Sequence, residues 1–190
     1  LEDSVISIAR ANYKVDYPAS FMLVASMNPC PCGYYGHPTK TCTCTPAAVA
    51  RYTSRLSGPL LDRIDLAVNV ECVAFDQISS RQNSECSADI RERVVRARAI
   101  QEQRFASHPG IHCNAQMTPT LIRQYAYPDA EGLRVLKDTM LRLSMSARAY
   151  DRILKVARTI ADLDASPTVL VHHIHEAISY RDIDRSSWRG

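Results

Sequence analysis

The sequence predicts an α/β layer followed by an all-α helical bundle. Two observations lead to this fold class: short apolar runs broken by Pro, Gly and Thr occupy the start of the chain, and amphipathic helical periodicity takes over afterwards. We expect an α/β part over residues 1–75 with a cysteine-rich loop at 29–45, a linker and basic connecting helix over 76–115, and a helical domain over 116–190.

The composition limits the class of protein. The chain has 190 residues, of which 46% are hydrophobic and 23% charged, and a formal net charge of +3 that is too small to argue for nucleic-acid binding by itself. No apolar run reaches the roughly 20 residues that a membrane span requires. Seven cysteines without a visible export signal argue against a disulfide scaffold and for a cytoplasmic protein. Because the first residue is Leu1, we expect a piece of a longer protein.

Three segments of the α/β part are predicted to be extended. Residues 6–11 alternate apolar and polar side chains, which suits a strand or one arm of a hairpin. Residues 21–25 form a continuous apolar run that Asn28 and Pro29 end, and such a run is typical of a parallel strand buried on both faces. Residues 64–70 alternate again and predict a second strand.

Caps and periodicity predict the helices. Thr45 followed by Pro46 is typical of a helix start, and we expect this helix to continue to about Arg55. The arginine-rich segment 90–105 has one apolar face and predicts a longer helix. Caps and apolar residues at intervals of three and four predict four further short helices. Two of them start at the caps Thr118 and Ser146, and the other two contain Leu133 and Ile174.

The loop at 29–45 is a candidate metal site. It holds two C-x-C pairs, Cys30 with Cys32 and Cys42 with Cys44, and four thiolates can close a tetrahedral zinc site. Glycines between the pairs allow the chain to turn back, and His37 is a substitute ligand if one cysteine faces away. The alternative is a loop of reduced thiols, or one that has been oxidised adventitiously. The other cysteines are isolated and predict no site: Cys72, Cys86 and Cys113.

A histidine-rich stretch near the C-terminal end of the sequence resembles a metal site only at first sight. His172, His173 and His175 lie close together in the sequence, but no nearby cysteine completes a ligand set. We interpret them as surface or capping histidines.

Three stretches resemble one known family. The stretches from Leu23 to Gly33, from Arg55 to Asp65 and from Ser146 to Leu163 are similar to the magnesium-chelatase-related, ComM-type family of AAA+ ATPases. The likeness runs nearly from end to end and implies the C-terminal part of an AAA+ core followed by a helical lid. The phosphate-loop motif G-x-x-x-x-G-K-[ST] is absent from the sequence. The resemblance places it upstream of Leu1, so this chain alone is expected to bind ATP weakly and to be inactive.

The resemblance assigns roles to four residues. Asn28 matches the first sensor, whose amide orients the attacking water, and Arg63 matches the arginine finger that stabilises the transferring phosphoryl group of a neighbouring subunit. Arg148 matches the second sensor at the start of a lid helix. Arg10 lies in a segment similar to the pore hairpin of related helicases, where a cation can contact DNA phosphates.

The implied function is that of a ring-forming, hexameric ATPase that uses ATP and magnesium to drive DNA remodelling or branch migration. Two alternatives stay open. One is a magnesium-chelatase-like metal-insertion chaperone ATPase, and the other is a non-catalytic zinc-loop interaction module. The cysteine loop favours the first function, since the chelatase ATPase subunit lacks this loop in the family pattern.

Overall fold

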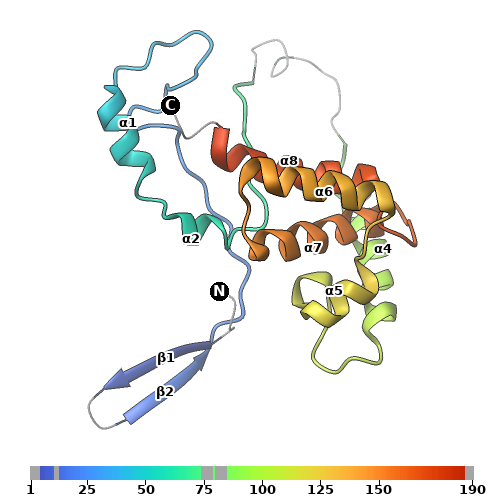
Figure 1. The fold of residues 1–190 in the computed structure, drawn as a ribbon. Coiled ribbons are helices and arrows are strands. Elements are labelled where there is room, and N and C mark those ends of the chain that lie inside the picture. The colour runs from blue at the N-terminus through green and yellow to red at the C-terminus, as the bar shows by residue number, and fades with distance from the viewer. Residues whose placement is uncertain (1–4, 11–12, 74–78, 80–84, 187–190) are drawn as a thin grey trace. The chain divides into compact units, whose positions relative to one another are not determined.

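The structure is a computed structural model that describes residues 5–10, 13–73, 79 and 85–186 (Figure 1). The chain divides into two compact units, with the boundary between Ile64 and Asp65. The first unit carries a hairpin, the cysteine loop and two short helices, and the second unit carries the remaining helices. Among the described residues, no helix is long and apolar enough to cross a membrane.

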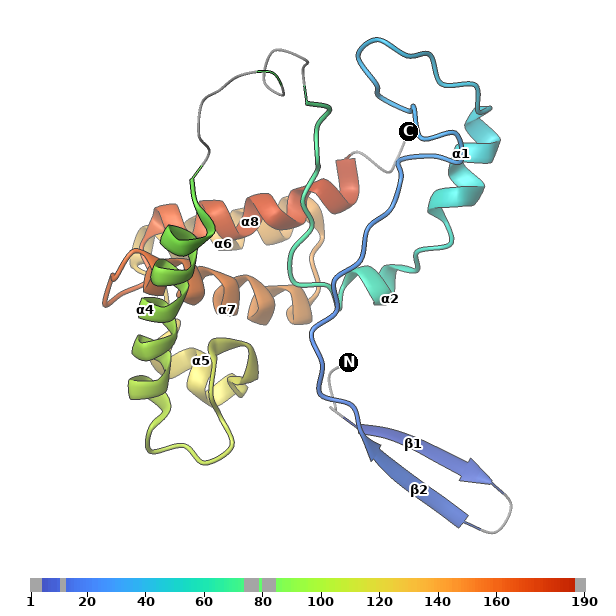
Figure 2. The same ribbon diagram turned by 180° about the vertical axis from the view of Figure 1, so that it is seen from behind.

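The first unit opens with a two-stranded antiparallel hairpin (Figure 2). Strand β1 (Val5–Arg10) pairs with β2 (Tyr13–Pro18), and the register places Ser7 opposite Asp16 and Ile8 opposite Val15. The hairpin arm predicted from the alternation is confirmed. Because side chains alternate between faces, one face carries mostly apolar and aromatic residues. Its members are Ile6, Ile8, Arg10, Tyr13, Val15 and Tyr17.

The parallel strand predicted over 21–25 and the second strand predicted over 64–70 are not formed in this structure. Both segments have irregular backbone, and their apolar side chains are exposed, with Val24 82% and Val68 66% accessible. A parallel strand needs a neighbouring strand to take up its N–H and C=O groups, and the described part of the chain supplies none beside either segment. The prediction of parallel strands is therefore corrected for this chain.

Two short helices follow the cysteine loop, and each begins at a hydroxyl cap. Helix α1 (Pro46–Thr53) starts where Thr45 Oγ1 accepts the backbone N–H of Ala48 at 3.3 Å, with proline in the first turn as predicted. Helix α2 (Gly58–Leu61) is a single turn, and Ser57 Oγ accepts the N–H of Leu60 at 3.3 Å. This turn ends immediately before Asp62 and Arg63.

The second unit is a helical bundle built around α7 (Ala147–Leu163). Helix α7 packs against α8 (Val171–Ser186), α4 (Ser87–Phe105), α5 (Pro119–Tyr125) and the 3-10 turn η1 (Asn114–Gln116), while α6 (Ala130–Leu143) packs against α8. The predicted bundle is confirmed. Its core consists of fully buried apolar side chains that include Leu136, Ile153, Leu154, Ala157, Ala161, Ile174 and Ala177.

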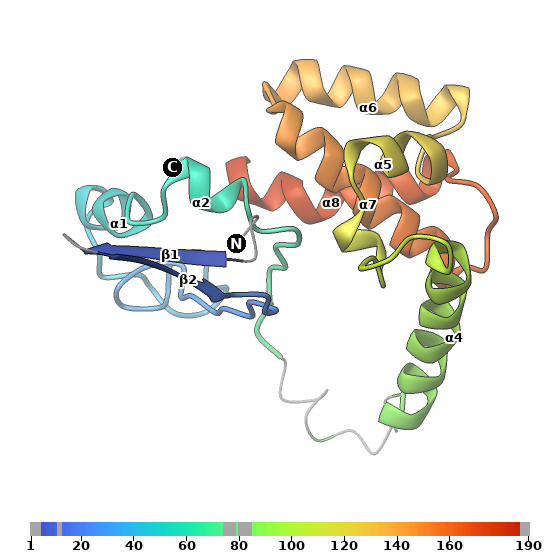
Figure 3. The same ribbon diagram turned by 90° about the horizontal axis from the view of Figure 1, so that it is seen from below.

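Helix α4 is buried only in its C-terminal half. Ala97, Gln101 and Phe105 are buried, whereas Ile90 and Val94, which share the same predicted face, are 43% and 47% exposed. The N-terminal half extends past the other helices of its unit (Figure 3). The sequence therefore predicted the helix and its face correctly, but not the length over which that face is covered.

A buried polar cluster joins α4, η1 and α7. The Asp162 carboxylate accepts hydrogen bonds from Arg104 at 2.7 Å, from Asn114 Nδ2 at 2.7 Å and from Arg158 Nε at 3.1 Å. Arg158 also donates to the carbonyl oxygens of Ser166, at 2.5 Å, and Pro167, at 3.0 Å. Because Arg158 and Asp162 are 1% and 2% exposed, these hydrogen bonds offset the loss of hydration of both charges.

Candidate metal centre and nucleotide-sensing residues

The cysteine loop is folded by turns that its glycines make possible. The backbone N–H of Gly33 donates to the carbonyl oxygen of Cys30 at 3.0 Å, and Gly33 and Gly36 adopt φ angles of +82° and +76°. These are left-handed conformations that other residues rarely adopt. The turns send the chain back on itself, so that the second C-x-C pair reaches the first.

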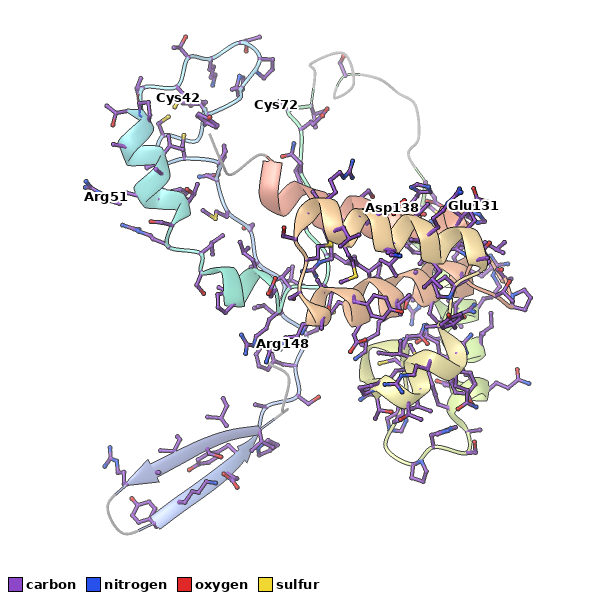
Figure 4. The ribbon with its side chains drawn as sticks, viewed as in Figure 1. Cys42, Arg51, Cys72, Glu131, Asp138 and Arg148 are labelled. Carbon is purple, nitrogen blue, oxygen red and sulfur yellow. The ribbon has the colours of Figure 1, made fainter. Side chains whose placement is uncertain are left out.

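The four cysteine sulfur atoms of the loop form one close cluster. The Sγ of Cys30 lies 3.3 Å from that of Cys32 and 3.7 Å from that of Cys42, and the latter two are 3.5 Å apart. With Cys44, all four lie within 4.8 Å of one another. Cys42, one of the four, is labelled in Figure 4. A tetrahedral zinc ion with Zn–S bonds of about 2.3 Å holds its sulfur ligands about 3.8 Å apart. The donor set therefore fits a zinc site with four cysteine ligands.

His37 does not belong to this cluster. Its Nδ1 accepts the backbone N–H groups of Thr39 at 3.2 Å and Lys40 at 3.0 Å, so the ring stabilises a local turn. The four cysteines provide a complete tetrahedral ligand set without a substitute histidine.

The loop shifts the pKa values of two of its thiols, Cys32 and Cys42, in opposite directions. The backbone N–H of Tyr34 stabilises the Cys32 thiolate, and although burial opposes ionisation, the pKa of Cys32 falls to about 5. The backbone N–H of Cys44 favours ionisation of Cys42, but burial and hydrogen bonds with the other three sulfurs outweigh it and raise the pKa of Cys42 to about 12. Four thiolates side by side repel one another, and a bound cation would remove this penalty.

The histidine-rich stretch at the start of α8 is not a metal site, although three ligand atoms of Asp164, His172 and His173 lie within 4.8 Å of one another. His173 Nδ1 accepts the backbone N–H of Leu170 at 2.9 Å. The neutral ring must then carry its proton on Nε2, which faces the Asp164 carboxylate at 3.2 Å and has no lone pair for a metal. Burial lowers the pKa of His173 and keeps the ring neutral. The capping role predicted for these histidines is confirmed for His173.

The residues predicted to handle nucleotide lie in both units. Asn28 is exposed just before the cysteine loop, and its side-chain amide lies next to Gly33. Arg63 is half-buried directly after α2, where its Nη1 donates to the Pro59 carbonyl oxygen at 2.9 Å. Arg148 is exposed in the first turn of α7, which begins where Ser146 Oγ accepts the N–H of Ala149 at 3.2 Å (Figure 4). Arg10 ends β1 at the hairpin tip.

The sequence reasoning missed a set of contacts that ties the segment after Arg63 to the helical unit. The carboxylate of Asp65 forms an ion pair with Arg152 of α7, and the backbone N–H of Ala67 donates to the Tyr180 carbonyl oxygen of α8 at 2.9 Å. Nothing in the spacing of these residues could have indicated the contacts, because each joins residues far apart in the chain.

Comparison with known proteins identifies the family. The family profile described as "Magnesium chelatase, subunit ChlI C-terminal" matches residues 84–181, and the profile described as "Magnesium chelatase, subunit ChlI" matches residues 1–78. The chain belongs to the magnesium chelatase ChlI family. The resemblance inferred from the three sequence stretches is confirmed. The helical content of this ChlI-family chain is compatible with the C-terminal lid region of an AAA+ protein.

Several curated proteins are similar to this ChlI-family chain over nearly its whole length. "Uncharacterized protein YifB" of Escherichia coli is 41% identical over 187 residues, and "Competence protein ComM" of Haemophilus influenzae is 38% identical over 187 residues. "Uncharacterized protein Rv2897c" of Mycobacterium tuberculosis is 35% identical over 181 residues. These alignments cover 95–97% of this chain, which spans 35% of the length of each of these relatives.

Proposed function

We propose that the chain is the sensor and arginine-finger part of an AAA+ ATPase that assembles into a cytoplasmic, hexameric ring and couples ATP hydrolysis to DNA remodelling or branch migration. ATP and magnesium would be held mainly by a phosphate loop outside this chain. The single observation that supports the proposal most is the match to the ChlI family over both halves of the chain, which includes the segments that carry Asn28, Arg63 and Arg148. We assign residues 1–75 to the AAA+ core and 116–190 to the lid.

The surroundings of Asn28 and Arg63 suit the roles proposed for them. A neutral amide at the end of an apolar segment can orient the attacking water without adding charge near the phosphates. Arg63 follows a one-turn helix whose start is fixed by the Ser57 cap, and a guanidinium presented in this way can reach the nucleotide of a neighbouring protomer. Its hydrogen bond to the Pro59 carbonyl defines a resting position from which it would be recruited.

Arg148 is proposed as the second sensor because of its place on α7. It lies in the first turn of the helix on which the bundle is built, so a force applied at its side chain acts on the whole unit. Contact with the γ-phosphate and loss of that contact after hydrolysis would bias the position of the lid.

Two further binding roles belong to the proposal. The four-cysteine cluster would hold a structural zinc ion, which would order a loop that has few apolar residues to bury. Arg10, at the end of the exposed hairpin strand β1, would contact DNA phosphates.

A magnesium-chelatase-like metal-insertion chaperone is the second candidate, since the family profiles carry that description. The four-cysteine cluster and the likeness to a protein named competence protein ComM favour DNA remodelling instead. A non-catalytic zinc-loop module is the third candidate and requires that Arg63 and Arg148 have no effect on nucleotide turnover.

One experiment separates these candidates. The experiment uses a version of the chain that is extended to the length of its relatives and is called the extended protein below. The ATPase activity of the extended protein is measured with and without forked DNA. We expect stimulation by DNA; activity that is indifferent to DNA favours the chaperone, and no activity favours the module.

Arg63→Ala in the extended protein should reduce kcat by about 10³-fold while nucleotide binding stays nearly unchanged, because an arginine finger acts in the transition state. Arg51→Ala, an exposed arginine on α1, is the control and should leave kcat unchanged. Equal loss of binding and turnover in Arg63→Ala would contradict a role in the neighbouring site.

Unchanged turnover in Arg148→Ala would contradict the second sensor.

A further inference from the structure

The segment that directly follows Arg63 is fastened to two helices of the second unit. Asp65 is the first residue of that unit, and its carboxylate pairs with the guanidinium of Arg152 on α7. Two residues later, the backbone N–H of Ala67 donates to the Tyr180 carbonyl oxygen of α8 at 2.9 Å. One side-chain contact and one backbone contact therefore hold residues 65–67 on the helical unit.

The anchoring arginine lies on the same side of α7 as Arg148. Residues four positions apart in a helix are neighbours on one face, so Arg152 follows Arg148 by one turn. Lys155 lies nearly one further turn along, and its Nζ donates to the Ala115 carbonyl oxygen at 2.8 Å. Burial lowers the pKa of Lys155, and Asp65 is the first of the charges that oppose this shift. Asp65 therefore contacts one cation of α7, Arg152, and acts electrostatically on a second, Lys155.

The covalent distance between Asp65 and Arg63 is short. Two residues of extended chain reach at most about 7 Å, so the position of Asp65 on α7 limits where Arg63 can lie. We propose that Asp65 is a positioning residue, which through its ion pair with Arg152 makes the placement of Arg63 depend on the position of α7, the helix that carries Arg148. The proposal rests on the proposed roles of Arg63 and Arg148 and adds the connection between them.

The competing explanation is that the ion pair between Asp65 and Arg152 only stabilises the fold. The exposure of its two side chains allows a test that separates the two explanations. The Asp65 side chain is 55% exposed and that of Arg152 is 15% exposed. Because the Asp65 carboxylate is mostly in water, neutralising it costs little stability and should leave the fold intact. If Asp65 positions Arg63, the same change lowers the rate of turnover without weakening nucleotide binding.

The test uses the extended protein with Asp65→Asn, with Arg152→Asp, and with the charge-swapped pair Asp65→Arg and Arg152→Asp. Glu131→Gln is the matched control, because Glu131 forms an exposed ion pair with Arg134 on α6, at 3.9 Å. We expect kcat to fall about tenfold in each single variant, the size of a typical coupling between sites. For Asp65→Asn, the nucleotide Kd and the melting temperature should match those of Glu131→Gln. Arg152→Asp alters a mostly buried side chain and is read only through the swapped pair, which should recover most of the kcat lost in the single variant.

The Arg63→Ala background decides which proposal fails. Asp65→Asn should cause no further loss of kcat in that background, because both changes affect the same group. If Arg63→Ala alone leaves kcat unchanged, the proposed function is wrong and this inference with it. If Arg63→Ala removes turnover but Asp65→Asn behaves like Glu131→Gln, or lowers kcat only together with the melting temperature, the inference is wrong and the proposed function stands.

Discussion

The four cysteine side chains show how a residue's chemistry depends on its neighbours. Identical thiols in one loop differ in pKa from about 5 for Cys32 to about 12 for Cys42, because backbone N–H groups favour the first thiolate, whereas burial and the other sulfurs disfavour the second. Zinc binding would convert all four to thiolates and release the remaining protons.

The zinc site leads to a prediction for two serine variants. Cys32→Ser should lower the zinc content of the chain from about one equivalent to less than about a tenth, because a three-cysteine site loses one of four strong bonds. Cys72→Ser is the control, since Cys72 is exposed and outside the cluster, and it should keep the zinc. The measurement is metal analysis of protein that has never met a chelator. Little zinc in the unmodified chain would contradict the site.

The same site has a predicted pH dependence once the metal is removed. Because the pKa of Cys32 is lowered, its thiolate is present above about pH 5, whereas the raised pKa of Cys42 keeps that group a thiol at neutral pH. Iodoacetamide at pH 7 should therefore label Cys32 before Cys42 in metal-free protein, as mass spectrometry of the peptides can show. Equal labelling rates would show that the loop does not distinguish the two thiols.

At the scale of elements, three helix starts were predictable and two helix ends were not. Thr45, Thr118 and Ser146 each accept an N–H of the first turn, a local interaction that the sequence displays. Helices α6 and α7 close through left-handed residues, Ser144 and Ala165, with φ of 48° and 52°. Glycine is the usual residue there, so its absence left no signal of the ends.

Contacts between elements explain the remaining failures of the sequence analysis. The four-cysteine cluster could be predicted because turns within one loop bring its members together. The ion pair of Asp65 with Arg152 joins residues 87 positions apart, and the predicted strands depend on neighbours that no local pattern contains. Periodicity reports which face of a helix is apolar, as on α4, but not how much of that face another element covers.

The left-handed conformation at the end of α7 can be tested by removing the methyl group of Ala165. Ala165 closes the helix with its N–H on the Asp162 carbonyl at 3.1 Å, and the N–H of Ser166 reaches the Ala161 carbonyl at 2.8 Å. Removing the exposed Cβ relieves the left-handed strain, so Ala165→Gly should raise the free energy of unfolding by about 0.5–1 kcal/mol, the strain less the entropy cost of glycine.

The control for this change is the same substitution within a regular helix. Ala99 is exposed in the interior of α4, and Ala99→Gly should lower the free energy of unfolding by about 1 kcal/mol. Urea denaturation of both variants measures the two effects. A loss of stability in Ala165→Gly would show that residue 165 is not left-handed in solution.

At the scale of the whole molecule, two segments rich in apolar residues are exposed to solvent. Residues 21–25 have the pattern of a buried strand and residues 64–70 that of an alternating strand, yet both segments are irregular and largely accessible. The curated relatives are nearly three times as long as this chain, since it spans 35% of their length. A strand partner in the extended protein would satisfy both the backbone and the apolar side chains of these segments.

Hydrogen exchange tests this explanation directly. In the 190-residue chain, the amides of Leu23 and Val68 should exchange nearly as fast as in an unfolded peptide, because their segments form no strand. In the extended protein, pairing with neighbouring strands should slow their exchange by about a hundredfold or more. Amides inside α7, such as that of Ala157, lie in a helix that is already packed and serve as the control, with similar protection in both proteins. Fast exchange at Leu23 and Val68 in both would show that the apolar runs do not form sheet strands in the longer protein either.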